Sequence, residues 1–328
     1  MQPRHYRVLH DGTVSMIEPT LKYVPCPGPA AAGATAQEGH RMAYWEWNDT
    51  GDPRHPHVIV CAHGLSRQGR DFDTLARRLC RHARVVCPDV AGRGRSDWLT
   101  DPMDYQLPVY VADMLALLAQ LHQQAPIVAL DWVGTSMGGL LGMGICGVPD
   151  LPLPAPVRRL VLNDVGPCLE WQALQRIGQY LGQPAHFDSL QQAADALWVV
   201  SSTFGPHTSQ EWLELSRAMV RPAPQGGFVL HYDPAIAVAF RALTPEAASA
   251  GEQQMWQLYD RIAAQVLLLR GTQSDLLSPQ TAQQMTARGP RARLVEFAGV
   301  GHAPTLLHDD QVDVVARFLL DGQGEPAA

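Results

Sequence analysis

The sequence lacks the cysteine spacings that indicate a metal site or a disulfide framework. Its six cysteines are scattered, with no CxxC pair and no histidine at zinc-finger spacing. We therefore expect reduced thiols with structural roles, and no bound metal.

Two further absences restrict the location and the partners of the protein. The N-terminal residues contain no apolar, signal-like stretch, and no run approaches the roughly 18 apolar residues that a membrane span needs. The formal net charge is −7, which argues against binding to nucleic acid because phosphate binding normally shows as a basic excess. These features predict a cytoplasmic protein with no membrane or nucleic-acid partner, and they leave the oligomeric state open.

Strand and helix patterns alternate along most of the chain. The 328 residues, 46% of them hydrophobic, suffice for a large core. Short buried runs predict strands at residues 42–47, 57–64, 83–89, 126–134, 157–167, 263–271 and 292–299. Helical periodicity predicts helices at residues 70–82, 110–124, 137–147, 278–288 and 309–320. This order predicts an α/β protein with a mostly parallel central sheet and helices on both faces.

The alternation stops between residues 167 and 260, where the pattern is helical, irregular and rich in aromatic residues. Candidate helices lie at residues 169–181, 189–202, 209–220 and 252–262. We predict an inserted helical cap packed on the sheet domain. The expected organisation is an N-terminal extension and linker (1–40), a first core part (41–166), the cap insertion (167–260), a second core part (261–322) and a tail (323–328).

A lone serine lies between glycines in VGTSMGGLLG, residues 133–142, after a buried run and before a helical one. A sharp strand-to-helix turn forces the apex residue, Ser136, into a strained conformation and leaves room only for small residues two positions away. Gly134 and Gly138 occupy those positions. The turn exposes the hydroxyl at a helix N-terminus, where N–H groups can stabilise developing negative charge. Ser136 is therefore the candidate nucleophile.

A serine nucleophile needs a base, and the base needs an acid that orients it. Both are expected at the carboxyl ends of later strands, where ligands bind along the edge of a parallel sheet. His302 lies in a glycine-rich loop directly after one predicted strand, and Asp275 lies a few residues past another. The order Ser136, Asp275, His302 is the one expected for this type of turn. We predict these three as the catalytic residues.

Two further motifs give the chain a family resemblance. They are AHGLSRQGRDF at residues 62–72 and PDVAGRGRSD at residues 88–97. With these motifs and the serine turn, the chain resembles the α/β-hydrolase fold family, in its capped serine hydrolase branch. The resemblance covers residues 45 to 320 and implies the α/β-hydrolase fold. It also implies a DxxGxGxS turn, formed by Asp89, Gly92, Gly94 and Ser96.

The resemblance also implies roles for individual residues. The backbone N–H groups of Leu65 and Met137 are expected to form the oxyanion hole. Asp164 is an alternative acid, since some relatives carry the acid after that earlier strand. His63 is expected to shape the loop rather than transfer protons. The serine nucleophile disfavours dehalogenases and epoxide hydrolases of the family, because both need a carboxylate nucleophile.

Arg67 lies two residues past Leu65 in a segment rich in arginine. Most of that segment is expected to be a solvated helix face. Arg67 could instead bind a substrate carboxylate, in which case the substrate is an anionic ester, a lactone acid or a hydroxyacid oligomer.

The predicted reaction is a two-step acyl transfer without a metal or an organic cofactor. The aromatic and aliphatic residues of the cap favour an apolar pocket for an ester of small to medium acyl chain. A carbon–carbon bond hydrolase of ring-cleavage products, a lactonase or an acyltransferase would use the same three residues. A ligand-binding protein on the same fold would keep the pocket and lose turnover.

Overall fold

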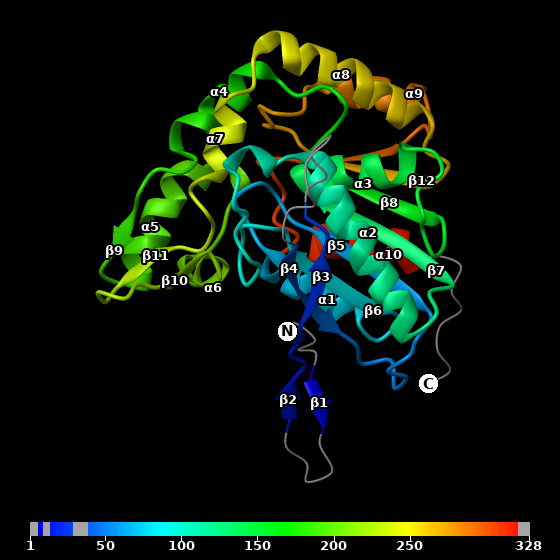
Figure 1. The fold of residues 1–328 in the computed structure, drawn as a ribbon, viewed down its shortest axis with the longest axis horizontal. Helices are drawn as coiled ribbons and strands as arrows, with labels where there is room; N and C mark the ends of the chain where they lie inside the picture. The colour runs from blue at the N-terminus through cyan, green and yellow to red at the C-terminus, as the bar shows by residue number, and fades with distance from the viewer. Residues whose placement is uncertain (1–5, 9–13, 29–38, 321–328) are drawn as a thin grey trace.

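The computed structural model describes residues 6–8, 14–28 and 39–320, and a central eight-stranded sheet dominates these parts of the chain (Figure 1). Its strands are β3 (Thr20–Cys26), β4 (His40–Trp47), β5 (His57–Ala62), β6 (Arg84–Asp89), β7 (Ala129–Thr135), β8 (Val157–Asn163), β12 (Gln265–Gly271) and β13 (Arg293–Phe297). In space their order is β13-β12-β8-β7-β5-β6-β4-β3. The six strands from β13 to β6 are parallel, and β4 and β3 continue the sheet by antiparallel pairing.

Helices cover both faces of the sheet, as the sequence predicts. On one face lie α2 (Leu107–Gln124), α3 (Met137–Gly147), α8 (Pro245–Asp260) and α9 (Pro279–Ala287), and on the other lie α1 (Asp73–Leu79) and α10 (Asp309–Leu320). Alternate residues of a strand point to opposite faces. On β5, Val58 and Val60 accordingly pack under the first group, and Ile59 and Cys61 under the second. All six strand residues are buried, which explains the continuous apolar run.

The segment between β8 and β12 is not only helical. It contains α4 (Trp171–Tyr180), α5 (Leu190–Ser201), α6 (Ser209–Arg217), α7 (Ile236–Arg241) and α8. It also contains β9 (His186–Phe187), β10 (Val220–Pro222) and β11 (Phe228–Leu230), which form a small antiparallel sheet. Sequence analysis missed these strands because two or three residues are too few to show an alternating pattern.

Different parts of this inserted segment pack differently. The small sheet lies with α5 and α6 to one side of the main sheet, whereas α8 lies over the core helices (Figure 1). A Cβ on Gly147 of α3 would lie 2.4 Å from the carbonyl oxygen of Leu258 in α8, so the two helices are in close contact. The boundaries expected for the cap insertion stay a prediction.

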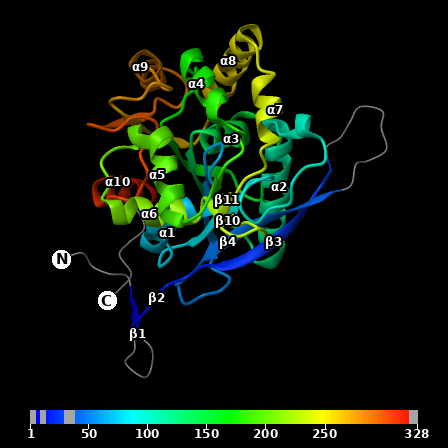
Figure 2. The same cartoon turned by 90° about the vertical axis from the view of Figure 1, so that its left-hand side faces the viewer.

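The N-terminal extension contains the edge strand of the main sheet. β3 pairs antiparallel with β4 from Thr20 opposite Glu46 to Cys26 opposite His40. The predicted linker therefore begins after Cys26, and most of it lies outside the described residues. A further antiparallel pair, β1 (Tyr6–Val8) and β2 (Val14–Met16), lies apart from the main sheet (Figure 2).

Three short 3₁₀ helices complete the described elements: η1 (Gly69–Phe72), η2 (Pro102–Asp104) and η3 (Ser202–Phe204). None of the described helices is long and apolar enough to cross a membrane. All six cysteines are free; four are buried and two are half-buried.

Candidate active site

Ser136 occupies the sharp turn between β7 and α3 that the sequence predicts. Its backbone dihedrals are φ 52° and ψ −119°, so a non-glycine residue holds a strained conformation with positive φ. A Cβ on Gly134 would lie 2.2 Å from the carbonyl oxygen of Gly138, and a Cβ on Gly138 would lie 1.9 Å from that of Ala62. Larger residues at these two positions cannot fit, because the obstructing atoms belong to the backbone.

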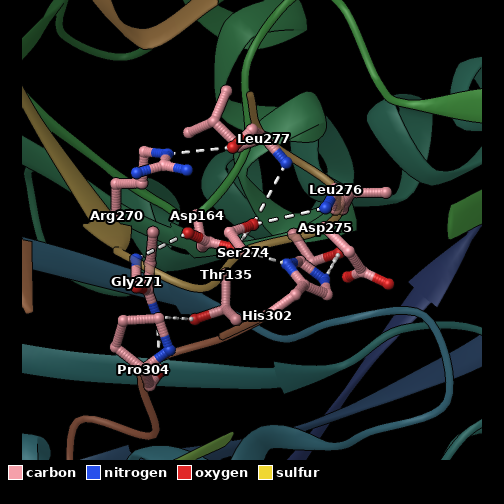
Figure 3. A network of polar contacts seen from close by, with 12 residues as sticks. Thr135, Asp164, Arg270, Gly271, Ser274, Asp275, Leu276, Leu277, His302 and Pro304 are labelled. Carbon is pink, nitrogen blue, oxygen red and sulfur yellow. Dashed lines mark hydrogen bonds and ion pairs between the residues drawn. The ribbon is translucent and has the colours of Figure 1, made fainter. Parts of the chain in front are cut away.

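His302 connects the serine to a carboxylate. Its Nε2 lies 3.0 Å from Oγ of Ser136, and its Nδ1 lies 2.8 Å from Oδ2 of Asp164. The imidazole is 10% exposed and the carboxyl group is fully buried. The structure therefore brings together Ser136, His302 and the alternative acid, Asp164, from segments that follow three different strands. Figure 3 shows the contact of His302 with Asp164.

The sequence predicts Asp275 as the acid that orients the histidine, but the structure places Asp164, and not Asp275, against the imidazole. Asp275 instead forms an ion pair with Arg176 of α4, with Nε–Oδ2 and Nη2–Oδ1 distances of 2.8 and 3.0 Å. Its side chain is 44% exposed. The neighbouring residue, Ser274, takes the inward position and donates its hydroxyl to Oδ2 of Asp164 at 2.6 Å.

Asp164 is held by donors on both carboxylate oxygens. Oδ1 accepts the backbone N–H of Gly271 at 2.9 Å, and Oδ2 accepts from Ser274 as well as from His302. With Asp164 as the acceptor in all three contacts, the imidazole proton is assigned to Nδ1. Nε2 is then free to accept the hydroxyl proton of Ser136. Sequence analysis missed Ser274, since no motif distinguishes a serine beside a candidate acid.

A second residue that the sequence did not single out fixes the turn relative to the histidine loop. The side-chain amide of Asn163, at the end of β8, donates to Oγ1 of Thr135 at 3.0 Å and to the carbonyl oxygen of Pro304 at 2.8 Å. The backbone N–H of Ser136 also donates to the carbonyl oxygen of Asn163 at 3.0 Å. Asn163 therefore links the residues on both sides of the Ser136–His302 contact.

The loop after β5 lies against the serine turn. A Cβ on Gly64 would lie 3.6 Å from Cβ of Ser136. His63 is fully buried, contacts the carbonyl oxygen of Gly64 through Nδ1 and accepts the N–H of Val90 through Nε2. Burial lowers the pKa of His63 to about 3, and the charges of Arg93 and Arg67 act in the same direction. His63 thus stays neutral and holds the loop, in agreement with the structural role expected for it.

The predicted DxxGxGxS turn is also a tight, hydrogen-bonded unit. Oδ1 of Asp89 accepts the N–H of Gly69 and Oδ2 accepts that of Arg95, at 2.8 and 2.9 Å. Burial raises the pKa of Asp89 to about 6, against the lowering effect of these bonds. Gly94 has no room for a side chain, because its Cβ would lie 2.3 Å from Asp89. Ser96 donates to the carbonyl oxygen of Asp89 and accepts the N–H of Ala43.

A pocket of about 260 Å³ opens above Ser136 and His302. One wall comes from the loop after β5, including Leu65 and Arg67. The inserted segment supplies most of the apolar lining: Ile177, Tyr180, Phe187, Leu197, Val200, Phe204, Leu215, Met219, Leu230 and Tyr232. The lining is therefore predominantly apolar, and it includes Ser136, His302 and a few other polar groups.

Arg67 lies in this pocket and is held by a neighbouring carboxylate. Its Nε and Nη2 donate to the two oxygens of Asp71 at 2.6 and 2.8 Å, and its guanidinium lies 5.8 Å from the ring centre of Phe204. Only 12% of the arginine side chain is exposed. Burial raises the pKa of Asp71, although the charge of Arg67 acts against this. The arginine is thus fixed in one orientation within the pocket.

Within the described parts of the chain, one group of side chains could hold a metal ion. It consists of Cys26, His40 and Asp113, whose ligand atoms lie within 4.8 Å of one another. None of the three lines the pocket. Nε2 of His40 is 2.9 Å from Oδ2 of Asp113, a direct hydrogen-bond distance.

Comparison with known proteins places the chain in a family. Residues 59–318 match the model of the alpha/beta hydrolase family. A 3-hydroxybutyrate-oligomer hydrolase from Cupriavidus necator is 49% identical over 304 residues, which cover 92% of this chain and 97% of that protein. A pimeloyl-(acyl-carrier protein) methyl ester esterase from Xanthomonas campestris pv. campestris is 25% identical, over 81% of this chain and 96% of its own.

A solved structure supports the same assignment. An alpha/beta hydrolase from Novosphingobium aromaticivorans is 35% identical and superposes with a TM-score of 0.76, covering 93% of this chain and 99% of its own. The fold predicted from the sequence is thereby confirmed. The chain belongs to the alpha/beta hydrolase family and is an enzyme of the hydrolase class.

Proposed function

We propose that the protein is a serine ester hydrolase with Ser136 as nucleophile, His302 as general base and Asp164 as the orienting acid. The observation that carries this proposal is the continuous hydrogen-bonded chain from Oγ of Ser136 through both ring nitrogens of His302 to a buried carboxylate. In such an arrangement the histidine can accept the serine proton while the carboxylate stabilises the resulting imidazolium.

The reaction proceeds in two steps. Oγ of Ser136 attacks the ester carbonyl as its proton passes to Nε2 of His302, and the tetrahedral oxyanion is held by the N–H groups of Leu65 and Met137. The carbon–oxygen bond then breaks, and the leaving alcohol takes the proton from His302. Water, activated by the same nitrogen, next attacks the acyl-enzyme and releases the carboxylic acid and free Ser136.

We further propose that the substrates are short oligomers of 3-hydroxybutyrate or closely related hydroxy acids. The Cupriavidus necator relative, 49% identical over nearly the whole chain, is named for hydrolysis of such oligomers. Each ester bond of such an oligomer links the carboxyl group of one unit to the hydroxyl of the next. The oligomer chain carries only short branches and is mostly apolar. A predominantly apolar pocket of about 260 Å³ suits such a small chain better than a long acyl group.

Arg67 is the residue proposed to bind the free carboxylate at the end of an oligomer. The two bonds to Asp71 occupy Nε and Nη2, and Nη1 makes no hydrogen bond to any residue in the described ranges. A guanidinium can bind carboxylates along more than one edge. Since Asp71 already fixes the orientation of Arg67, little side-chain entropy is lost when a substrate carboxylate binds.

The test is cleavage of the linear 3-hydroxybutyrate dimer by the purified protein, with released monomer measured by chromatography. We expect turnover by wild type and none by Ser136→Ala. Arg67→Ala should raise KM for the free dimer by about tenfold, the value of one charge-assisted contact. It should leave KM for the dimer methyl ester, which has no carboxylate, within about twofold. Arg78→Ala, which removes an exposed arginine outside the pocket, is the matched control.

Each failure has a distinct meaning. Cleavage of p-nitrophenyl butyrate without cleavage of the dimer would reject the oligomer substrate and keep the ester hydrolase. Equal effects of Arg67→Ala on the dimer and its methyl ester would reject carboxylate binding by Arg67. Activity on a vinylogous diketone acid alone would replace the ester hydrolase by the carbon–carbon bond hydrolase.

A further inference from the structure

Arg93 is a fully buried arginine without a carboxylate partner in the described parts of the chain. It lies between the two glycines of the DxxGxGxS turn, where its backbone is fixed on both sides. Gly94 N–H donates to the carbonyl oxygen of His231 at 2.9 Å, and Asp233 N–H donates to that of Gly92 at 2.7 Å. Burying a guanidinium is costly unless its donors are satisfied, so its contacts indicate what it stabilises.

The guanidinium contacts several partners in different directions. Nε donates to the carbonyl oxygen of Leu65 at 2.8 Å, and Nη2 lies 3.7 Å from Sδ of Met137. Nη1 donates to the carbonyl oxygen of Ala91 at 2.7 Å and to Oη of Tyr110 at 2.8 Å. The guanidinium carbon also lies 4.9 Å from the ring centre of Tyr110. One side chain therefore bridges the loop after β5 and the first residue of α3.

Leu65 and Met137 are the two residues whose backbone N–H groups are proposed to hold the oxyanion. They come from segments about 70 residues apart in sequence, and the oxyanion hole works only if both N–H groups point to the same position. We infer that Arg93 is the positioning residue that sets the Leu65 loop and Met137 relative to each other. This inference rests on the proposed function.

A guanidinium suits this role better than any other side chain. Its planar fork places Nε, Nη1 and Nη2 in fixed directions, so that the carbonyl of Leu65, the hydroxyl of Tyr110 and the sulfur of Met137 are contacted at once. Lysine carries the same charge but has a single nitrogen on a flexible stem. Replacing Arg93 by lysine therefore keeps the positive charge and removes the fixed directions of the donors, so the variant tests the geometry separately from the charge.

The experiment compares wild type with Arg93→Lys in hydrolysis of p-nitrophenyl butyrate. We expect kcat to fall by about 10–100-fold with KM changed by less than about threefold, because the oxyanion contacts form only in the transition state. Inhibition by butaneboronic acid, which forms a tetrahedral adduct with the serine, should weaken by a similar factor. Inhibition by butyrate, which forms no such adduct, should not change.

Arg84→Lys is the matched control. Arg84 is also buried but lies in β6, where its Nε donates to Glu46 at 2.8 Å, and it is not among the residues that line the pocket. It should lower the melting temperature and leave kcat and boronate inhibition unchanged. A melting-temperature loss in Arg93→Lys with unchanged kcat, or equal weakening of the boronate and of butyrate, would overturn the inference.

Two further measurements keep the test decisive. If Arg93→Lys does not fold, Tyr110→Phe removes one partner of Nη1 without touching the pocket. A fall in kcat of about threefold or more at constant KM then supports the inference, and an unchanged kcat rejects it. Labelling of Ser136 by a fluorophosphonate reports on the proposed function separately, since wild type that is neither labelled nor active would reject the ester hydrolase itself.

Discussion

Replacing Asp164 by asparagine is expected to remove most of the activity with little change in the shape of the site. The carboxylate now accepts three donors: the N–H of Gly271, the hydroxyl of Ser274 and Nδ1 of His302. An asparagine has one acceptor oxygen and one NH₂ group. If its oxygen keeps the bond to Gly271, its NH₂ group faces His302 and forces Nδ1 to accept a hydrogen bond.

The consequence is a wrong tautomer. With Nδ1 as acceptor, the imidazole proton moves to Nε2, which can then no longer take the proton of Ser136. Substitutions of this kind reduce kcat by roughly 10⁴-fold, or about 5.4 kcal/mol at about 1.36 kcal/mol per tenfold. For Asp164→Asn we expect kcat to fall by roughly 10³- to 10⁴-fold.

Asp275→Asn is the matched comparison. Asp275 and its partner Arg176 are 44% and 36% exposed, and ion pairs at such positions contribute about 0–1 kcal/mol because solvent screens them. We expect kcat within about threefold of wild type and a melting temperature lowered by only a few degrees.

Both variants would be assayed with p-nitrophenyl butyrate across pH 5 to 9, with melting temperatures as the check on folding. The reasoning would be refuted if folded Asp164→Asn retained more than about a tenth of wild-type kcat. It would equally be refuted if Asp275→Asn lost activity by orders of magnitude, since the orienting acid would then be the exposed carboxylate.

Three further predictions concern the turn, the loop and the pocket. Gly138→Ala should abolish the folded state, because its Cβ would lie 1.9 Å from a backbone oxygen. As a control, a Cβ on Gly251 in α8 meets no atom within 4 Å, so Gly251→Ala should raise the melting temperature slightly. Normal folding of Gly138→Ala would contradict the close packing. The pKa of His63 is about 3 when folded, against about 6.5 when unfolded, so the unfolded state binds one more proton between these values and stability rises with pH across this window. The free energy of unfolding, measured with urea at pH 4.5 and 6, should accordingly rise more steeply with pH for wild type than for His63→Gln, by roughly 1.4 kcal/mol per pH unit. Equal slopes would show that His63 is not held neutral. Among p-nitrophenyl esters from acetate to decanoate, kcat/KM should be highest for short chains and at least about tenfold lower for decanoate, because the pocket volume is about 260 Å³. A kcat/KM that rises with chain length up to decanoate would show that the pocket opens further.

Much of the fold and part of the site follow from local sequence. The buried run of β5 and the helical periodicity of α10 reflect contacts that every parallel sheet with helices on both faces must make. The Ser136 turn is equally local, since the spacing of Gly134 and Gly138 already indicates where the backbone has no room for side chains. His302 could be selected because a glycine-rich loop after a strand end places it at the correct edge of the sheet.

Other features depend on how distant segments meet. Asp164 and Asp275 both follow parallel strands, so sequence order cannot decide between them. The decision comes from the path of the chain after β12, where Ser274 points inward to Asp164 and Asp275 points outward to Arg176. A side chain orients the histidine only if it is directed toward the ring, and that direction is set by the packing of two loops more than 100 residues apart.

The role inferred for Arg93 has the same origin. In the sequence it is one of many arginines in a basic stretch, and a solvated surface was expected for most of them. Folding instead buries it between the loop after β5 and α3 and gives it contacts to Leu65 and Met137. Sequence by itself determined the backbone turn that carries the nucleophile, because steric limits act between near neighbours. Tertiary structure alone decided which charged groups surround it, because burial and hydrogen-bond partners come from segments that meet only in the folded chain.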